Sequence, residues 1–524
     1  MKKQFNTTGT CFPQFHYMMD NSKKIEQVME LIDSGSYFTI NRPRQYGKTT
    51  TLNFLYNKLD KSNNHIPISL SLQGVDEKWH ESDKMFAKMF IEQLAGFFKF
   101  SDNTIYTFLQ KEKDKVTDMD TLSKAITNLA HKANKKLVLL IDEVDASSNY
   151  EPFLSFIGML RTKYLARTAP QNATFHSIIL AGVHDIKSLK YKIRDSKKTE
   201  YNSPWNIAID FKVNMSFTPQ EIAPMLAEYS AAEQVQMDIP SISERLYYHT
   251  SGYPFLICQL CKDIVEDILP VKPANQQKEW TVDDVEKSVQ ILLMKNNTNF
   301  DSLIKNLENH QDLYDLVFRI VIKGENLNFN PDNSVIKKGI LYGVFKRNGR
   351  IKIHNRIYEQ RIYNYLASNI AIKTNTHNYN YNAQFYLPNQ ELDVKKILLK
   401  FQLFMKEQYS EQDQPFLERE WRLLFLAFLQ PILNGGGHDF KEVQISEEKR
   451  LDIVITFYQH KYIVELKRWY GPQSHEAGLQ QLVDYLDRQH QQRGYLVIFE
   501  YRTTKTWRME TIDQKGKEIF AVWI

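Results

Sequence analysis

Short apolar runs alternate with longer stretches of helical period through the first part of the chain. Because these runs are either continuously apolar or alternate at period two, they are expected as strands, at 37–40, 66–72, 137–141, 176–183 and 213–217. Helical spacing of apolar residues predicts helices near 25–32, 81–99, 119–134 and 151–167. Alternating strands and helices predict an α/β fold in which helices cover both faces of a parallel sheet.

The pattern becomes helical after residue 218 and then changes again. Residues 219–308 are expected to form a helical lid, and 309–366 a winged-helix-like module that turns a hairpin at Asn348-Gly349. The segment 333–358 holds seven Lys or Arg residues and no acid. This basic hairpin is expected either to contact DNA phosphates or to pack, as a solvated wing, against the first domain.

The last part of the chain has its own apolar strands. Residues 367–386 are rich in Asn, Thr and Tyr with little periodicity, and we interpret them as a linker. Helices are expected at 391–408, 418–433 and 476–489, with strands at 442–446, 453–458, 462–466 and 494–499. The expected domains are therefore 1–218, 219–308, 309–366 and 387–524, with the linker between the last two.

Length, charge and cysteine content limit the number of domains and the cellular compartment that we expect. A chain of 524 residues is too long for one core, and its net charge of +5 alone indicates no particular partner. The sequence shows no apolar run long enough for a membrane span and no apolar segment behind its first lysines, so no membrane partner is expected. Three cysteines fit a reducing cytoplasm, and Cys258 and Cys261, in an apolar helix, are expected to pack in the core.

The first candidate site follows the strand at 37–40. The order strand, loop, Gly-Lys-Thr, helix is typical of a phosphate-binding loop, although Arg42 stands where that pattern has its first glycine. The loop and the first helical turn present backbone N–H groups to phosphate. The residues expected to bind ATP here are Arg44, Gln45, Tyr46, Gly47, Lys48, Thr49 and Thr50. Lys48 is expected to reach the outer phosphates and the Thr49 hydroxyl to hold Mg²⁺.

Two later strands end in polar residues that fit the same site. Asp142 is expected to orient Mg²⁺ and Glu143 to polarise the attacking water, since ligands bind at the carboxyl ends of parallel strands. The alternative is a core strand capped by two solvated acids. His184 and Asp185 follow the next strand and are candidates for sensing the γ-phosphate.

A second cluster is expected in the C-terminal domain. Folding the runs 453–458 and 462–466 about a short turn places Asp452 opposite Glu465 to Lys467. Glu465 and Lys467 are two apart, so both point to one face. Carboxylates suit Mg²⁺, and Lys467 could steady or deprotonate a nucleophile. Gln481 and Tyr485 share one face of the next helix.

Asp452, Glu465-x-Lys467 and Gln481-x-x-x-Tyr485 resemble the PD-(D/E)XK nuclease superfamily in its RecB-like form. The whole chain, with RPRQYGKTTTL, LIDE, AGVHDI, SGYP and VELK in order, resembles bacterial proteins that join an AAA-ATPase-like domain to such a nuclease. The resemblance implies a P-loop NTPase domain followed by a restriction-endonuclease-like α/β domain. It also implies a helix acid at Glu420 or Glu418, with Glu420 preferred, and a nucleotide contact from Pro254.

Three functional interpretations follow. The first is an ATP-regulated, Mg²⁺-dependent nuclease that acts on DNA; the resemblance implies a role in defence against foreign DNA. The second keeps the ATPase but makes the C-terminal domain a nucleic-acid binder that does not cut. The third is a signalling switch in which ATP drives the formation of a homo-oligomer, and salt-dependent DNA binding would separate it from the other two.

Overall fold

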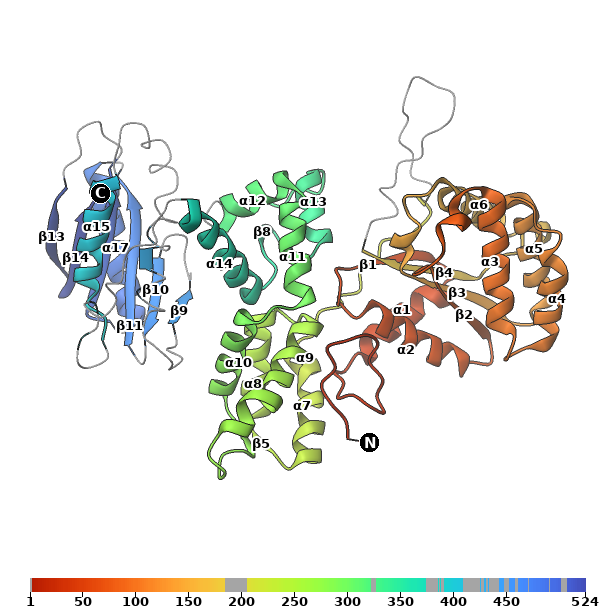
Figure 1. The fold of residues 1–524 in the computed structure, drawn as a ribbon, viewed down its shortest axis with the longest axis horizontal. Helices are drawn as coiled ribbons and strands as arrows, with labels where there is room; N and C mark the ends of the chain where they lie inside the picture. The colour runs from red at the N-terminus through yellow and green to blue at the C-terminus, as the bar shows by residue number, and fades with distance from the viewer. Residues whose placement is uncertain are drawn as a thin grey trace, which may run out of the picture. The chain divides into compact units, whose positions relative to one another are not determined.

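The computed structural model describes most of the chain (Figure 1). The described residues are 2–183, 205–321, 327–373, 391–408, 443–446, 452–457, 460–469, 471–489, 491–500 and 507–524, with single positions at Phe385, Leu387, Phe425, Phe428, Leu429 and Ile432. Internal contacts divide the chain into two compact units. Unit 1 comprises 1–309, 330–348 and 353–358, and unit 2 comprises 310–329, 349–352 and 359–524.

Unit 1 is built on a parallel sheet of four described strands in the order β1-β4-β3-β2. The strands are β1 (Tyr37–Asn41), β2 (His65–Ser71), β3 (Lys136–Asp142) and β4 (Ser177–Gly182). Asn41 pairs with Gly182 and Ser71 with Asp142, so the carboxyl ends of all four strands share one edge. This confirms the α/β fold and the strands expected from four of the five apolar runs.

Helices cover both faces of this sheet because alternate residues of its strands point to opposite sides. Val138 and Leu140 pack with α1 (Ser22–Asp33) and α2 (Lys48–Asp60). Leu139 and Ile141 pack on the other face with α3 (Asp83–Phe98), α4 (Asn103–Lys113), α5 (Met119–Lys132) and α6 (Glu151–Ala166). All four β3 side chains are fully buried, as expected for a strand between two helical layers.

The prediction of a strand at 213–217 is wrong. This segment is irregular, and β1 has instead a single parallel bridge from Phe38 to Ile209. Backbone groups of the segment have other partners: Arg42 Nη2 donates to Val213 O over 2.8 Å, and Phe217 N donates to Gly252 O over 2.9 Å. A backbone that is already bonded to a side chain and to the turn between α8 and α9 has fewer groups left for pairing with β1.

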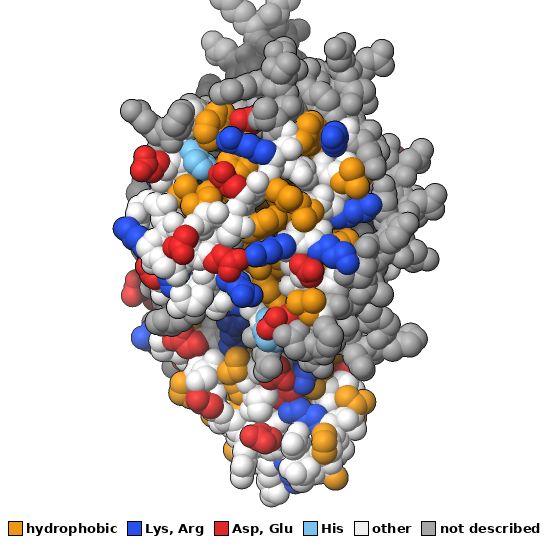
Figure 2. Space-filling view, turned by 90° about the vertical axis from the view of Figure 1, so that its left-hand side faces the viewer, with side chains coloured by type: hydrophobic (Ala, Val, Ile, Leu, Met, Phe, Trp, Pro, Cys, Tyr) orange, Lys and Arg blue, Asp and Glu red, His pale blue; other side chains and the backbone are white. Residues whose placement is uncertain are grey.

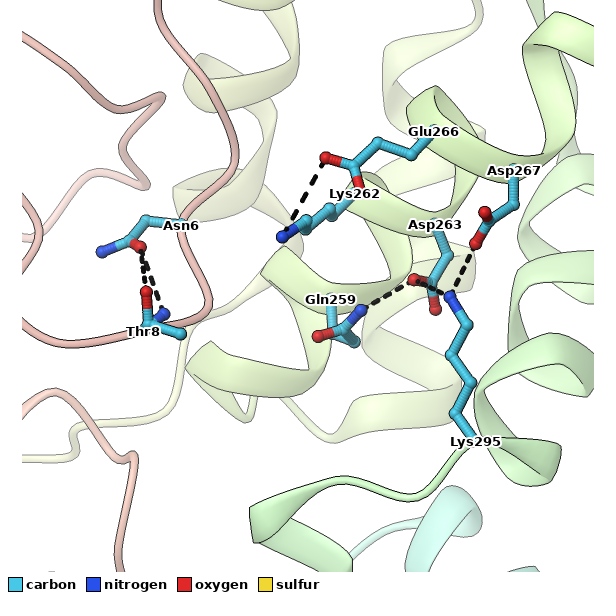
Figure 3. Close-up of polar contacts among 8 residues, drawn as sticks. All are labelled: Asn6, Thr8, Gln259, Lys262, Asp263, Glu266, Asp267 and Lys295. Atoms are coloured by element: carbon cyan, nitrogen blue, oxygen red, sulfur yellow. Dashed lines mark hydrogen bonds and ion pairs between the residues drawn. The ribbon is translucent and has the colours of Figure 1, made fainter.

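A helical region follows, as expected. Its described elements are α7 (Pro219–Glu233), β5 (Gln236–Met237), α8 (Ile239–Thr250), α9 (Pro254–Asp263), a π-helical turn (Ile264–Ile268), β6 (Glu279–Trp280), α10 (Val282–Met294) and α11 (Thr298–Glu308). Cys258 and Cys261 are buried in α9, which confirms their packing role. Lys295 Nζ lies 2.8 Å from Asp263 Oδ1 and 2.6 Å from Asp267 Oδ2, so it holds the end of α10 against the π-helical turn (Figure 3).

The predicted hairpin turn is present in the next segment. Gly349, with φ +67°, lies between β7 (Phe345–Asn348) and β8 (Arg350–Ile353). The helices before and after it in the sequence are α12 (Gln311–Val321), α13 (Ser334–Leu341) and α14 (Arg356–Lys373). α14 therefore includes the beginning of the segment interpreted as a linker, and 374–384 lie outside the described residues.

Unit 2 contains a mixed sheet of six described strands in the order β13-β14-β12-β11-β10-β9. The strands are β9 (Val443–Ser446), β10 (Asp452–Phe457), β11 (His460–Arg468), β12 (Arg493–Phe499), β13 (Met509–Gln514) and β14 (Lys517–Trp523). α15 (Val394–Gln408) shares one core with Val497, and α17 (Pro472–Arg488) shares a second core with Leu496. Since these neighbours in β12 point to opposite sides, the sheet is buried on both faces.

On the face shown in Figure 2, Lys and Arg side chains are interspersed with Asp, Glu and hydrophobic ones. Leu403 and Met509 are large hydrophobic residues that remain exposed. Within the part of the chain that the structure describes, no helix is both long and apolar enough to cross a membrane.

Candidate functional sites

The loop between β1 and α2 closes around a lysine. Gly47 caps α2 with φ +79°, and Gln45 also has a positive φ, of 57°. Lys48 Nζ donates to Arg42 O and Pro43 O, each over 3.0 Å. The Lys48 side chain is buried, which lowers its pKa against the opposing effect of the nearby acids. The ammonium group therefore occupies the centre of the loop, where an anion would meet it together with the N-terminus of α2.

Two oxygen donors lie beside this loop. Thr49 Oγ1 donates to Asp142 Oδ2 over 2.6 Å, and Asp142 Oδ1 accepts from Glu143 N over 2.9 Å. A hydroxyl and a carboxylate oxygen in contact are the hard ligands that Mg²⁺ prefers, so these residues fit that ion. Glu143 is half-buried, and its backbone φ is 53°. Its pKa is raised, mainly because the carboxylate is buried and also because the negative charge of Asp142 is close. A carboxylate with a raised pKa is a better proton acceptor near neutral pH.

Asp145 holds the end of β4 against the turn after β3. Its Oδ2 accepts a short hydrogen bond from Val183 N. A side chain at Gly182 would place Cβ 2.8 Å from Val144 Cγ2 and 3.0 Å from the Asp145 oxygens, so only glycine allows this approach. No motif or periodicity in the sequence indicates this role of Asp145. The predicted sensor residues His184 and Asp185 come directly afterwards and lie outside the described residues.

A cavity of about 120 Å³ adjoins the loop. Tyr46 and Gly47 of the loop and Thr50 of α2 form one side of it. The other sides come from the N-terminal segment, the irregular segment before α7, and α9, including Cys11, Met19, Met215, Phe217, Pro254 and Cys258. Pro254 thus lies at the cavity, where a nucleotide contact was expected of it. The mostly apolar lining suits a flat base next to a phosphate site.

Three consecutive loop residues form hydrogen bonds with residues of unit 1 that lie after the parallel sheet in the sequence. Arg44 O accepts from Tyr253 OH over 2.6 Å, and Gln45 Nε2 donates to Thr298 Oγ1 over 3.1 Å. Tyr46 OH lies 2.6 Å from Ser216 Oγ and 3.1 Å from His354 Nε2. Burial lowers the pKa of His354 to about 4, so this imidazole is neutral at physiological pH.

These contacts refine what was expected of the loop residues. The side chains of Gln45 and Tyr46 are directed at helical and C-terminal parts of unit 1. The loop backbone, Lys48 and the guanidinium of Arg44, whose charge acts on Lys48 and Glu143, are left as groups for a phosphate. No periodicity or motif in the sequence predicts partners so far along the chain.

The second cluster lies in unit 2. β10 and β11 are antiparallel with Asp452 opposite Glu465, as the hairpin prediction required. The side chain of Glu465 is 3% exposed, and its Oε1 lies 3.2 Å from Lys467 Nζ. Lys467 Nζ also donates to Gln481 Oε1 over 3.4 Å. Tyr485 is buried on the same helix. The structure thus brings Glu465, Lys467 and Gln481 together.

The metal ligands expected in unit 2 are only partly described. Among the described side chains, no group of three His, Cys, Asp or Glu residues could hold a metal ion. The side chain of Asp452 is not among them, and Glu418 and Glu420 lie outside the described residues. The described side chains therefore provide one buried carboxylate, that of Glu465, beside the amine of Lys467.

The fold of unit 1, with its loop, lysine and paired acids, is that of a P-loop ATPase-like domain. The family model described as "AAA-like domain" matches residues 13–360, which is well over half of the chain. The chain therefore belongs to the AAA-like domain family. No curated protein matches the sequence.

Several solved structures are similar at low identity. A Walker-type ATPase of Pyrococcus abyssi is 12% identical, with 68% of this chain and 99% of that chain covered and a TM-score of 0.45. The ORC2 protein of Aeropyrum pernix is 11% identical, with 70% and 98% covered and a TM-score of 0.41. The RuvB Holliday junction branch migration motor of Thermotoga maritima is 13% identical, with 68% and 98% covered and a TM-score of 0.33.

Proposed function

We propose that unit 1 binds ATP with Mg²⁺ and hydrolyses it. The observation that carries this proposal is the convergence of the Lys48 ammonium, the Thr49–Asp142 oxygen pair and Glu143 at the carboxyl edge of the parallel sheet. Ligands bind at this edge in open α/β sheets. Membership of the AAA-like domain family supports the same conclusion.

Each residue has a distinct part in the proposed reaction. Lys48 and the N-terminus of α2 bind the phosphates and hold them in place. Thr49 and Asp142 would hold Mg²⁺, which would supply positive charge to the phosphates. Glu143 orients the attacking water and accepts its proton, and its raised pKa suits that task. The adjoining cavity, with Pro254 in its wall, receives the base.

The full chain should release phosphate from ATP only when Mg²⁺ is present. Chelation with EDTA should stop the release, because the Thr49–Asp142 pair would then have no cation through which to act on the phosphates. Phosphate release is measured before EDTA, after EDTA, and after excess Mg²⁺ is restored. Release that continues at the same rate in EDTA would contradict the proposal.

A second function is proposed for unit 2: Mg²⁺-dependent cleavage of DNA. The observation that favours it is the pairing of Asp452 with Glu465 in the strand register, with Lys467 Nζ 3.2 Å from the Glu465 carboxylate. Bound Mg²⁺ would polarise the phosphodiester, and Lys467 would stabilise charge beside the nucleophile. The resemblance to RecB-like nucleases supports DNA as the substrate. The alternative is a unit 2 that binds nucleic acid without cutting it.

A further inference from the structure

A glycine in α17 lies directly against the lysine of the second cluster. A Cβ built on Gly478 would stand 1.9 Å from Lys467 Nζ, 2.6 Å from Cε and 2.7 Å from Cδ. Real atoms do not approach so closely, so an alanine at this position would displace the lysine. The last three atoms of Lys467 occupy their place only because residue 478 has no side chain.

The lysine is also held at its tip. Its Nζ lies 3.2 Å from Glu465 Oε1 and 3.4 Å from Gln481 Oε1, and its side chain is 13% exposed. Gln481 comes three residues after Gly478, so both lie on the same face of α17. Gly478 thus provides the space along the lysine stem, and Gln481 and Glu465 bind the amine at its end.

Glycine is a poor choice for the interior of a helix unless packing requires it. It lowers helix propensity relative to alanine, and a glycine in mid-helix usually has a packing or functional reason. α17 runs from Pro472 to Arg488, and Gly478 is well inside it. The contact with Lys467 supplies that reason.

We propose that Gly478 is a positioning residue for Lys467, which keeps the amine beside Glu465 and within reach of Gln481. The significance of this position for catalysis rests on the proposed cleavage of DNA by unit 2. The positioning of Lys467 by Gly478 does not depend on that function, because it concerns only where the lysine lies.

The test replaces Gly478 by alanine in the full chain. The clash involves the far end of a flexible side chain, so the lysine should move while the fold is kept, and the melting temperature should stay the same or rise. Lys467 should then react faster with acetic anhydride, as measured by mass spectrometry of its peptide. Single-turnover DNA cleavage should fall by about a hundredfold, the scale expected when a reacting group is misplaced by about 1 Å.

Gly158→Ala is the matched control. Gly158 also lies inside a helix, α6, and a Cβ there meets nothing within 4 Å. This variant should leave both the acetylation of Lys467 and the cleavage rate unchanged. If it alters either as strongly as Gly478→Ala does, the effect is not specific to the lysine contact and the proposal fails.

The variants Lys467→Ala and Gly478→Ala/Lys467→Ala complete the test. If Gly478 acts through the lysine, adding Gly478→Ala should not change the residual cleavage of Lys467→Ala. Should Gly478→Ala alone fail to fold, the double variant should fold, because the clashing atoms are gone; failure of both would overturn the proposal.

The outcomes separate the two claims. Unchanged acetylation of Lys467 in Gly478→Ala would overturn the positioning role even if wild-type protein cuts DNA. Faster acetylation together with a wild-type protein that cuts no DNA would support the positioning role and contradict the proposed nuclease.

Discussion

Glu143→Gln should reduce ATP turnover by at least about a hundredfold, the usual scale for losing a general base, and should leave ATP bound. The amide keeps the shape of the side chain but cannot accept the proton of the attacking water. Glu143 follows β3 directly and lies next to Asp142, whose Oδ1 accepts from Glu143 N. Phosphate release and nucleotide affinity would be measured on the same preparation.

Asp145→Asn is the informative comparison for Glu143→Gln. Asp145 Oδ2 accepts from Val183 N, so its carboxylate holds the end of β4. We expect this variant to lower the melting temperature, because the end of β4 loses its hydrogen bond, and to keep most of the ATP turnover per folded molecule. If Asp145→Asn stops hydrolysis while Glu143→Gln turns over ATP at the wild-type rate, the base has been assigned to the wrong carboxylate.

The second large effect is expected in unit 2. Asp452→Ala, Glu465→Ala and Lys467→Ala should each reduce DNA cleavage by at least about a hundredfold, because each removes a metal ligand or the charge beside the nucleophile. None should alter ATP binding, since β10 and β11 belong to a sheet with its own cores. Plasmid cleavage over a range of Mg²⁺ concentrations, by wild type and variants purified identically, measures the effect.

Equal cleavage by wild type and Asp452→Ala would show a contaminating nuclease or a wrong active site. DNA binding at several salt concentrations should be measured in parallel, since contacts with phosphates weaken as salt rises. Salt-dependent binding without cleavage would support the alternative, in which unit 2 binds nucleic acid without cutting it.

The sequence predicted best those elements whose signal is local. β3 is a continuous apolar run followed by two acids, and its position between two helical layers follows from that pattern. The pairing of Asp452 with Glu465 followed from two apolar runs and the short turn between them. α4 is not among the predicted helices, although Asp102, a residue type that commonly caps helices, caps it by accepting from Thr104 N and Ile105 N.

What the sequence could not predict depends on contacts between distant residues. The segment at 213–217 has the composition of a strand, yet the Arg42 guanidinium and the Gly252 turn bond to its backbone. The bonds from Tyr253 to Arg44 O and from Tyr46 to His354 join residues more than 200 positions apart. The space that Gly478 leaves for Lys467 likewise appears only when α17 packs on β11.

The central claim is that Lys48 and its loop bind the phosphates of ATP, and calorimetry tests it most directly. Titration with ATP and Mg²⁺ would compare wild type, Lys48→Ala and Lys58→Ala, the last being an exposed lysine on the same helix. We expect wild type and Lys58→Ala to bind equally, and Lys48→Ala to bind at least about a hundredfold more weakly, since a charged hydrogen-bonding partner of the phosphates is lost. Undiminished affinity in a folded Lys48→Ala protein would contradict the account.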